Sequence, residues 1–314
     1  MPHVVFIHGL ANKPAPEILH DIWRRKLAHN GGIELGDHGV TSELVYWANA
    51  LYPAPDPNVA NYESQAAAPE LGAALNSNES VPDAVVADKP KMQRLMTALG
   101  VDSLQDDPAE VAAIDAETAA LIALERIPMP EFLRKRLMKK LARDAYLYFY
   151  NEEFAARPGE SYKVRDELRG RFVKHLREMR DKTDRLVIVS HSMGTMIAYD
   201  CLACVDDCPP VDGLMTVGSP LGLDEVQDFW TGWTRADGFP KKKLSGRWVN
   251  VYDRLDVVSG ADPRLASDYR LGGADRVEDI EEENWGTWRH SISKYLQGKQ
   301  LRTALADMLK IDWP

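Results

Sequence analysis

The segment LVIVSHSMG, residues 186–194, restricts the fold of this chain more than any other part of the sequence. Its first four residues are apolar and mostly β-branched, which predicts a buried strand. The strand leads directly into Ser190, Ser192 and Gly194, and a helical pattern begins at Met193. Small residues are needed here, because a sharp turn from strand to helix brings two backbones close together. The segment therefore predicts a strand, a tight turn around a serine, and a helix.

The turn has the pattern S-x-S-x-G, a variant of the nucleophile elbow G-x-S-x-G in which Ser190 occupies the first glycine position. A serine at such a turn is held rigidly at the edge of the sheet. Ser192 is therefore the candidate nucleophile. The backbone N–H groups at the start of the following helix favour negative charge nearby, so the N–H of Met193 is one candidate donor to an oxyanion.

Strand-like and helix-like segments alternate over most of the chain. Apolar runs predict strands over residues 4–7, 42–47, 185–190, 213–218 and 247–253. Helical periodicity lies between and after these runs. The alternation favours an α/β fold with a mostly parallel sheet of about six strands and helices on both faces. In such sheets ligands bind at the carboxyl ends of the strands.

A serine nucleophile needs a base, and the base needs a carboxylate that orients it. If the three residues occur in the chain order Ser…Asp…His, the carboxylate and the base both lie downstream of Ser192. His290 is the only histidine in that part of the sequence. His290 is therefore the candidate base. Asp253 and Asp256 follow the predicted strand 247–253, and either could serve as the carboxylate.

The loop after the first predicted strand can supply the second oxyanion donor. It reads HGLANKP, in which Gly9 allows close approach of the backbone. The N–H of Leu10 is the candidate donor. His8 has no metal-ligating partner near it in the sequence, so we expect it to shape the loop.

Residues 52–145 interrupt the alternating pattern. Residues 41–130 contain 14 Asp or Glu against 4 Lys or Arg, a net charge of −10 that equals the net charge of the whole chain. We expect a core formed by 1–51 and 146–314, with 52–145 as a helical acidic insertion. The insertion is interpreted as a cap over the site, with a dimerisation arm, and hence a homo-oligomer, as the alternative. Five apolar residues are expected to face the site: Leu95, Met96, Leu121, Ile122 and Leu124.

The segment 129–153 predicts a basic amphipathic helix, with leucines at positions 133, 137 and 141. A solvated basic face, or pairing with the acidic insertion, is the favoured interpretation. Peripheral contact with a membrane surface is the less favoured one. The acidic composition, with a pI near 5.4, argues against a nucleic-acid partner.

Composition and cysteine spacing narrow the class of protein further. No apolar run approaches the length of a membrane span or a signal-peptide core, so a cytoplasmic protein is expected. Cys201 and Cys204 form a CxxC pair, but only Cys208 lies nearby, and no second pair completes a metal site. We interpret the three as packed thiols, and expect neither a metal nor a cofactor.

Five segments together resemble the α/β-hydrolase superfamily, on its lipase and esterase side: VVFIHGL, LVIVSHSMG, TVGSPLG, VNVYDRLDVV and WRHSISKYL. They lie within 1–50 and 185–300. The resemblance places the acid in a D-x-V context, which is Asp256, with Asp253 as second choice. It implies a shortened form of the fold, because no strand precedes the one before the His-Gly loop.

The same resemblance implies a serine hydrolase that cleaves a carboxylic ester or a related acyl bond through Ser192, His290 and Asp256. A small-molecule or acyl substrate is then expected. The same machinery would also suit a peptidase, amidase, thioesterase or acyltransferase. A non-catalytic binding module on a hydrolase scaffold is a less favoured alternative.

Overall fold

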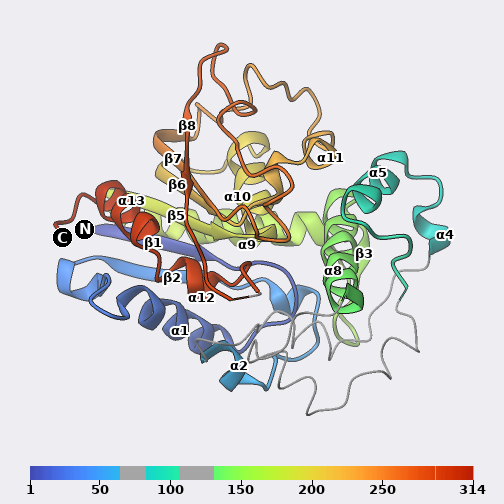
Figure 1. Cartoon of the computed structure of the whole chain (residues 1–314), viewed down its shortest axis with the longest axis horizontal. Helices are drawn as coiled ribbons and strands as arrows, with labels where there is room; N and C mark the ends of the chain where they lie inside the picture. Colours follow the sequence, from blue (N-terminus) through green and yellow to red (C-terminus); the bar gives the residue numbers. More distant parts are fainter. Residues whose placement is uncertain (64–82, 106–130, 287, 314) are drawn as a thin grey trace.

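The computed structural model describes residues 1–63, 83–105, 131–286 and 288–313. These residues form a six-stranded sheet of order β2-β1-β5-β6-β7-β8, in which all neighbouring strands are parallel (Figure 1). The chain is therefore of the α/β class. The strands are β1 Pro2–Ile7, β2 Thr41–Val45, β5 Arg185–His191, β6 Val211–Val217, β7 Leu244–Tyr252 and β8 Val277–Glu281.

Helices surround the sheet, and a two-stranded hairpin lies apart from it (Figure 1). The α-helices are α1 Pro16–Ala28, α2 Val59–Glu63, α4 Asp83–Val86, α5 Pro90–Ala98, α8 Glu131–Phe149, α9 Val164–Arg180, α10 Met193–Cys204, α11 Asp224–Gln227, α12 Ile292–Tyr295 and α13 Lys299–Leu309. The 3-10 helices are η1 Leu35–His38, η2 Ala48–Ala50 and η3 Pro220–Gly222. The hairpin joins β3 Glu153–Phe154 to β4 Tyr162–Lys163.

Alternate residues of each central strand enter different hydrophobic cores. In β1, Val4 and Phe6 pack into the core that contains α1 and α13, whereas Val5 and Ile7 pack into the core that contains α9 and α10. Both faces are covered, and for that reason these strands are nearly continuous apolar runs. The expected parallel sheet with flanking helices is confirmed.

The order of the strands creates a switch point between β1 and β5. From β1 the chain moves to β2 on one side, then crosses back to β5 on the other side and continues outward to β8. The carboxyl edge at such a switch point is the usual ligand position in open α/β sheets. Leu10 follows β1 and Ser192 follows β5.

Strand β8 is missing from the sequence-based expectations. Its sequence, VEDIE, has three acidic residues and two apolar ones, and only its first residue is buried. Among the described strands it pairs with β7 alone, at one edge of the sheet. An edge strand needs little apolar surface, so the sequence lacks the continuous hydrophobic run that marks the central strands.

Helix α8 differs from the expectation of a solvated basic face. Arg136, Lys140 and Arg143 are at most 3% exposed. Helix α8 packs against α5 and α9, and these side chains are buried with it. The expected boundary between positions 145 and 146 falls inside this helix, which runs without a break into the second part of the core.

The described part of the insertion packs against the body of the protein. Helix α5 contacts α8 and α11, and Arg94 forms an ion pair with Asp228 beyond α11. Leu95 and Met96 are buried in this helix. The other three apolar residues expected at the site, Leu121, Ile122 and Leu124, lie outside the described residues.

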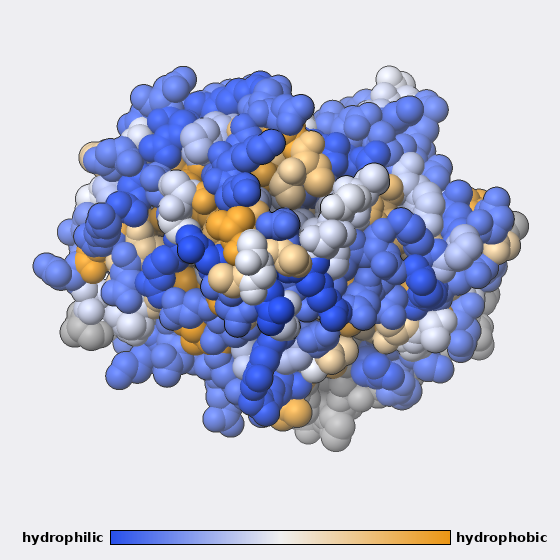
Figure 2. Space-filling view, turned by 90° about the horizontal axis from the view of Figure 1, so that it is seen from above, coloured by the Kyte–Doolittle hydropathy of each residue, from blue (hydrophilic) through white to orange (hydrophobic). Residues whose placement is uncertain are grey.

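The surface is mostly hydrophilic, and on the face seen from above the hydrophobic residues gather near its middle (Figure 2). Over the described ranges, the exposed large hydrophobic side chains are Met1, Ile18, Val85, Leu255 and Trp285. None of the described helices combines the length and apolar character required to cross a bilayer.

Candidate active site

Ser192 stands at the turn between β5 and α10 in a strained backbone conformation. Its φ is +52° and its ψ is −128°, a region that non-glycine residues rarely occupy. The Ser192 N–H donates to the carbonyl of Val217 at 3.0 Å, and its carbonyl accepts from the Thr195 N–H at 2.9 Å. These bonds hold Ser192 rigidly at the carboxyl edge of the sheet.

Two glycines make room for this turn. A Cβ atom on Gly194 would lie 2.5 Å from the carbonyl oxygen of His8, and one on Gly9 would lie 2.6 Å from Cβ of Ser192. Ser190 replaces the first glycine of the elbow pattern, and its hydroxyl donates to the carbonyl of Met215 at 2.9 Å. The serine is accommodated because it is small and its polar group has an acceptor.

The structure brings Ser192, His290 and Asp256 together from three distant parts of the chain. The distance from His290 Nε2 to Ser192 Oγ is 2.9 Å. His290 Nδ1 lies 2.9 Å from both carboxylate oxygens of Asp256. A carboxylate accepts only, so Nδ1 carries a proton, and in the neutral ring Nε2 accepts from the serine hydroxyl. All three side chains are buried.

Asp256 stays ionised although it is buried. Burial alone raises the pKa of its carboxyl group, but the adjacent His290 imidazole outweighs this effect, together with hydrogen bonds from the Val258 N–H and the Tyr295 hydroxyl. The resulting pKa is about 2. The carboxylate therefore remains available to orient His290 at any pH near neutrality.

Asp253, the second-choice acid, has different partners. Its carboxylate accepts from the N–H groups of Leu255 and Asn284, each at 2.7 Å, and pairs with Arg289 at 3.1 Å. Asn284 and Arg289 belong to the loop that carries His290. Asp253 is thus placed to hold this loop, while Asp256 faces the imidazole.

The two expected oxyanion donors follow β1 and β5 in the chain. Leu10 and Met193 are both buried, and within the described residues neither backbone N–H has an acceptor. Gly9 brings the loop after β1 against Ser192. The backbone next to Leu10 is itself unusual, because Ala11 has a φ of +66°.

His8 shapes the loop before Leu10, in agreement with the sequence-based expectation. Its Nε2 accepts from the N–H groups of Trp47 and Ala48 at 3.0 and 3.2 Å, and its Nδ1 donates to the Gly9 carbonyl at 2.8 Å. Burial lowers the pKa of His8 well below the usual value, and nearby Lys13 adds to the effect. The ring is therefore neutral and joins the loop to the segment after β2.

Two residues with no assigned role in the sequence support the triad. Tyr295 donates to Asp256 at 2.8 Å. His191 donates from Nε2 to the backbone carbonyl of His290 at 2.9 Å, and burial and the neighbouring His290 lower its pKa well below the usual value. The one sequence signal for a role of His191 is its position next to Ser192. Tyr295 carried none, because its contact depends on the tertiary fold.

The cysteines do not form a metal centre in the described part of the chain. Burial raises the pKa of Cys201 and Cys208, and both side chains are buried, whereas Cys204 is exposed. In the ranges that the structure describes, no group of three or more His, Cys, Asp or Glu residues is arranged to hold a metal ion.

Comparisons with known proteins give no family. No family model matches the chain, and no curated protein matches it. Among solved structures, the chain is similar to an uncharacterized protein from Pseudomonas aeruginosa, at 11% identity and a TM-score of 0.32. The alignment covers 98% of this chain and 46% of that one, so the chain spans about half the length of that structure.

Proposed function

We propose that this protein is a serine hydrolase with a shortened α/β-hydrolase fold, and that it cleaves a carboxylic ester or a related acyl bond. The observation that carries the proposal is the hydrogen-bonded series Ser192–His290–Asp256, with 2.9 Å between successive partners. The strained conformation of Ser192 and its place beside the switch point of the sheet give independent support.

The acylation step follows from the hydrogen-bond directions. His290 Nε2 removes the proton from Ser192 Oγ as this oxygen attacks the acyl carbon. The negative charge that develops on the acyl oxygen accepts hydrogen bonds from the N–H groups of Leu10 and Met193. Collapse of the intermediate breaks the bond to the leaving alcohol, which takes the proton back from His290.

Deacylation repeats these transfers with water. His290 Nε2 takes a proton from a water molecule, whose oxygen attacks the acyl-enzyme ester, and the same two N–H groups hold the second oxyanion. The Ser192–acyl bond then breaks, the carboxylic acid leaves, and Ser192 regains its proton. Asp256 keeps the proton on Nδ1 throughout, so Nε2 always faces the serine.

The proposal also includes the insertion as a cap over the site. Helix α5 packs on α11, and α11 follows the loop after β6 at the carboxyl edge that Ser192 shares. A segment in this position can shape the acyl-binding region. Shortening of Leu95 to Ala is then expected to change the preferred chain length among p-nitrophenyl esters, and an unchanged ranking contradicts the cap.

Chemical labelling tests the proposal directly. The purified protein should react with a fluorophosphonate, and peptide mass spectrometry should locate the adduct on Ser192. It should also release p-nitrophenol from a short-chain p-nitrophenyl ester. Ser190 is the matched control, because it lies two residues away on the same strand end. An adduct on Ser190, or no adduct at all, contradicts the proposed function.

A further inference from the structure

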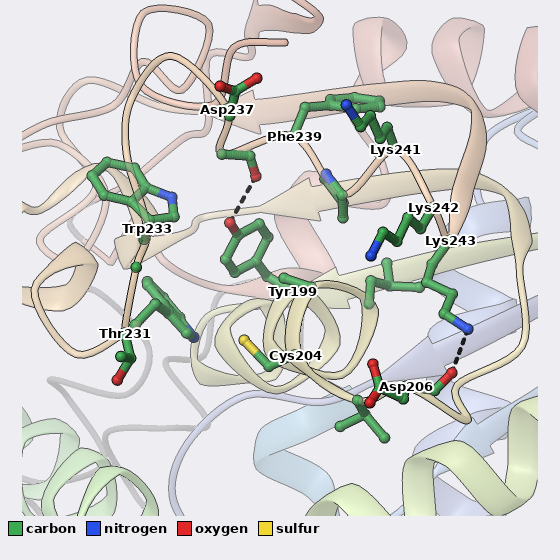
Figure 3. A pocket seen from close by; sticks show the side chains of 17 residues that line it. Tyr199, Cys204, Asp206, Thr231, Trp233, Asp237, Phe239, Lys241, Lys242 and Lys243 are labelled. Atoms are coloured by element: carbon green, nitrogen blue, oxygen red, sulfur yellow. Dashed lines mark hydrogen bonds between the residues drawn. The ribbon is translucent and has the colours of Figure 1, made fainter. Parts of the chain in front are cut away.

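A cavity lies at the end of α10 that is remote from Ser192. It has a volume of about 270 Å³ and lies between the last turn of α10 and the loop that leads from α11 to β7 (Figure 3). Helix α10 has 12 residues, so at 1.5 Å per residue its far end is roughly 17 Å from Ser192. The cavity is therefore separate from the candidate active site.

The walls of this cavity are aromatic. Tyr199, Trp230, Trp233 and Phe239 line it, and the rings of Tyr199 and Trp230 meet edge to face with centroids 4.9 Å apart. The Tyr199 hydroxyl donates to the Gly238 carbonyl at 2.7 Å and so ties the loop to α10 (Figure 3). Preformed walls of this kind suit a planar ring system.

The indole N–H of Trp230, a lining residue, is buried. The Trp230 side chain is 7% exposed, and its indole N–H has no hydrogen-bond partner within the described ranges. The nitrogen atom itself is buried, so it does not face the open cavity. Trp230 therefore contributes its ring, and not its N–H, to the cavity wall.

The charges around the opening leave one excess positive charge. The charged residues of the lining are three lysines and two aspartates: Lys241, Lys242, Lys243, Asp206 and Asp237. The Lys243 ammonium donates to the Asp206 carbonyl at 2.7 Å, and the Asp237 carboxylate accepts from the Gly272 N–H at 3.1 Å. Figure 3 shows the Lys242 ammonium turned into the cavity, whereas Lys241 extends along Phe239.

We propose that this cavity binds an aromatic monoanion, of which an aryl carboxylate is the simplest example. Its ring lies against the aromatic walls, and its carboxylate oxygens accept from the Lys242 ammonium. A charge-assisted hydrogen bond to the ammonium favours an anion over a neutral analogue of the same shape. This inference does not depend on hydrolase activity at Ser192.

Binding of 2-naphthoate and neutral 2-naphthamide to the full-length protein tests the proposal by calorimetry. The carboxylate is expected to bind about tenfold more tightly, which corresponds to roughly 1.4 kcal/mol. Cys204 lines the cavity and is the exposed cysteine of the three. Bound 2-naphthoate should therefore slow alkylation of Cys204 by iodoacetamide, followed by peptide mass spectrometry. Equal affinities, absent binding, or an unchanged alkylation rate overturns the proposal.

Two variants and one control identify the contacts. Lys242→Gln should weaken 2-naphthoate about tenfold while leaving 2-naphthamide within about twofold, because only the charge contact is lost. Trp230→Phe reduces the area of one aromatic wall, and should weaken both compounds. Lys299→Gln alters an exposed lysine on α13 and should change neither. Lys242→Gln with wild-type affinity for 2-naphthoate overturns the assignment.

Discussion

The Tyr295 hydroxyl donates a 2.8 Å hydrogen bond to Oδ2 of Asp256, the carboxylate that faces His290. The same hydroxyl accepts from the Asp253 N–H at 2.9 Å. Burial and the neighbouring Asp256 raise the pKa of Tyr295 well above its usual value, so the phenol keeps its proton. Tyr295 is therefore a positioning residue that fixes both the candidate acid and the loop that carries it.

Replacement of Tyr295 by Phe should lower ester turnover and stability together. Asp256 loses one donor, and the buried Asp253 N–H loses its acceptor, so the free energy of unfolding should fall by about 1–3 kcal/mol. Turnover should fall far less than the roughly 10⁴-fold loss expected when a triad carboxylate is removed. Chemical denaturation and ester hydrolysis measure the two effects, and unchanged values in both contradict the positioning role.

Ser192→Ala should remove ester hydrolysis by about 10³-fold or more, if the three residues act as a unit. The substitution keeps the backbone conformation and removes only the hydroxyl, so the protein should remain folded. Steady-state kinetics with a p-nitrophenyl ester measure the loss, and circular dichroism checks the fold. A variant that retains wild-type turnover excludes Ser192 as nucleophile.

Asp256→Asn and Asp253→Asn should have different effects. Asn at 256 favours the wrong imidazole tautomer, and turnover should fall by about 10⁴-fold with a smaller change in stability. Asn at 253 weakens the contacts with Asn284 and Arg289, so it should act mainly on the free energy of unfolding. The reverse pattern would transfer the acid role to Asp253.

The low pKa of Asp256 predicts a stability difference that depends on pH. The pKa is about 2 in the folded protein, against an ordinary value of 3.8. A lowered pKa adds stability above the ordinary value, and that contribution is lost as pH falls from about 4 to about 2. The shift corresponds to roughly 2 kcal/mol. The difference in unfolding free energy between wild type and Asp256→Asn should shrink across this range; a constant difference contradicts the assignment.

Gly194→Ala should destabilise the elbow, whereas Gly170→Ala should not. A Cβ at 194 would lie 2.5 Å from the backbone oxygen of His8, which cannot move without displacing β1. Such overpacking costs about 1–3 kcal/mol. Gly170 lies on α9 with nothing within 4 Å of the added atom, so alanine should stabilise this helix by roughly 0.5–1 kcal/mol. Thermal denaturation compares the two, and equal effects contradict the steric explanation.

Sequence pattern was sufficient for the class of fold and for the residues at the elbow. The central strands are buried on both faces, so each appears as a short apolar run, and the five predicted strands correspond to β1, β2, β5, β6 and β7. Ser192 and Gly194 follow one such run directly, and His290 is the single histidine downstream. These features are local or countable, and therefore visible without the structure.

Tertiary structure decided the features that depend on contacts between distant segments. The choice between Asp253 and Asp256 rests on which carboxylate reaches His290 and which one reaches Arg289. Strand β8 was missed because an edge strand has one partner and little apolar surface. The sequence pattern predicted a solvated basic face for α8, but its cations are buried. A helical period indicates which face of the helix a residue occupies, but not what packs on that face. Burial is a property of the packed chain, so a local pattern cannot specify it.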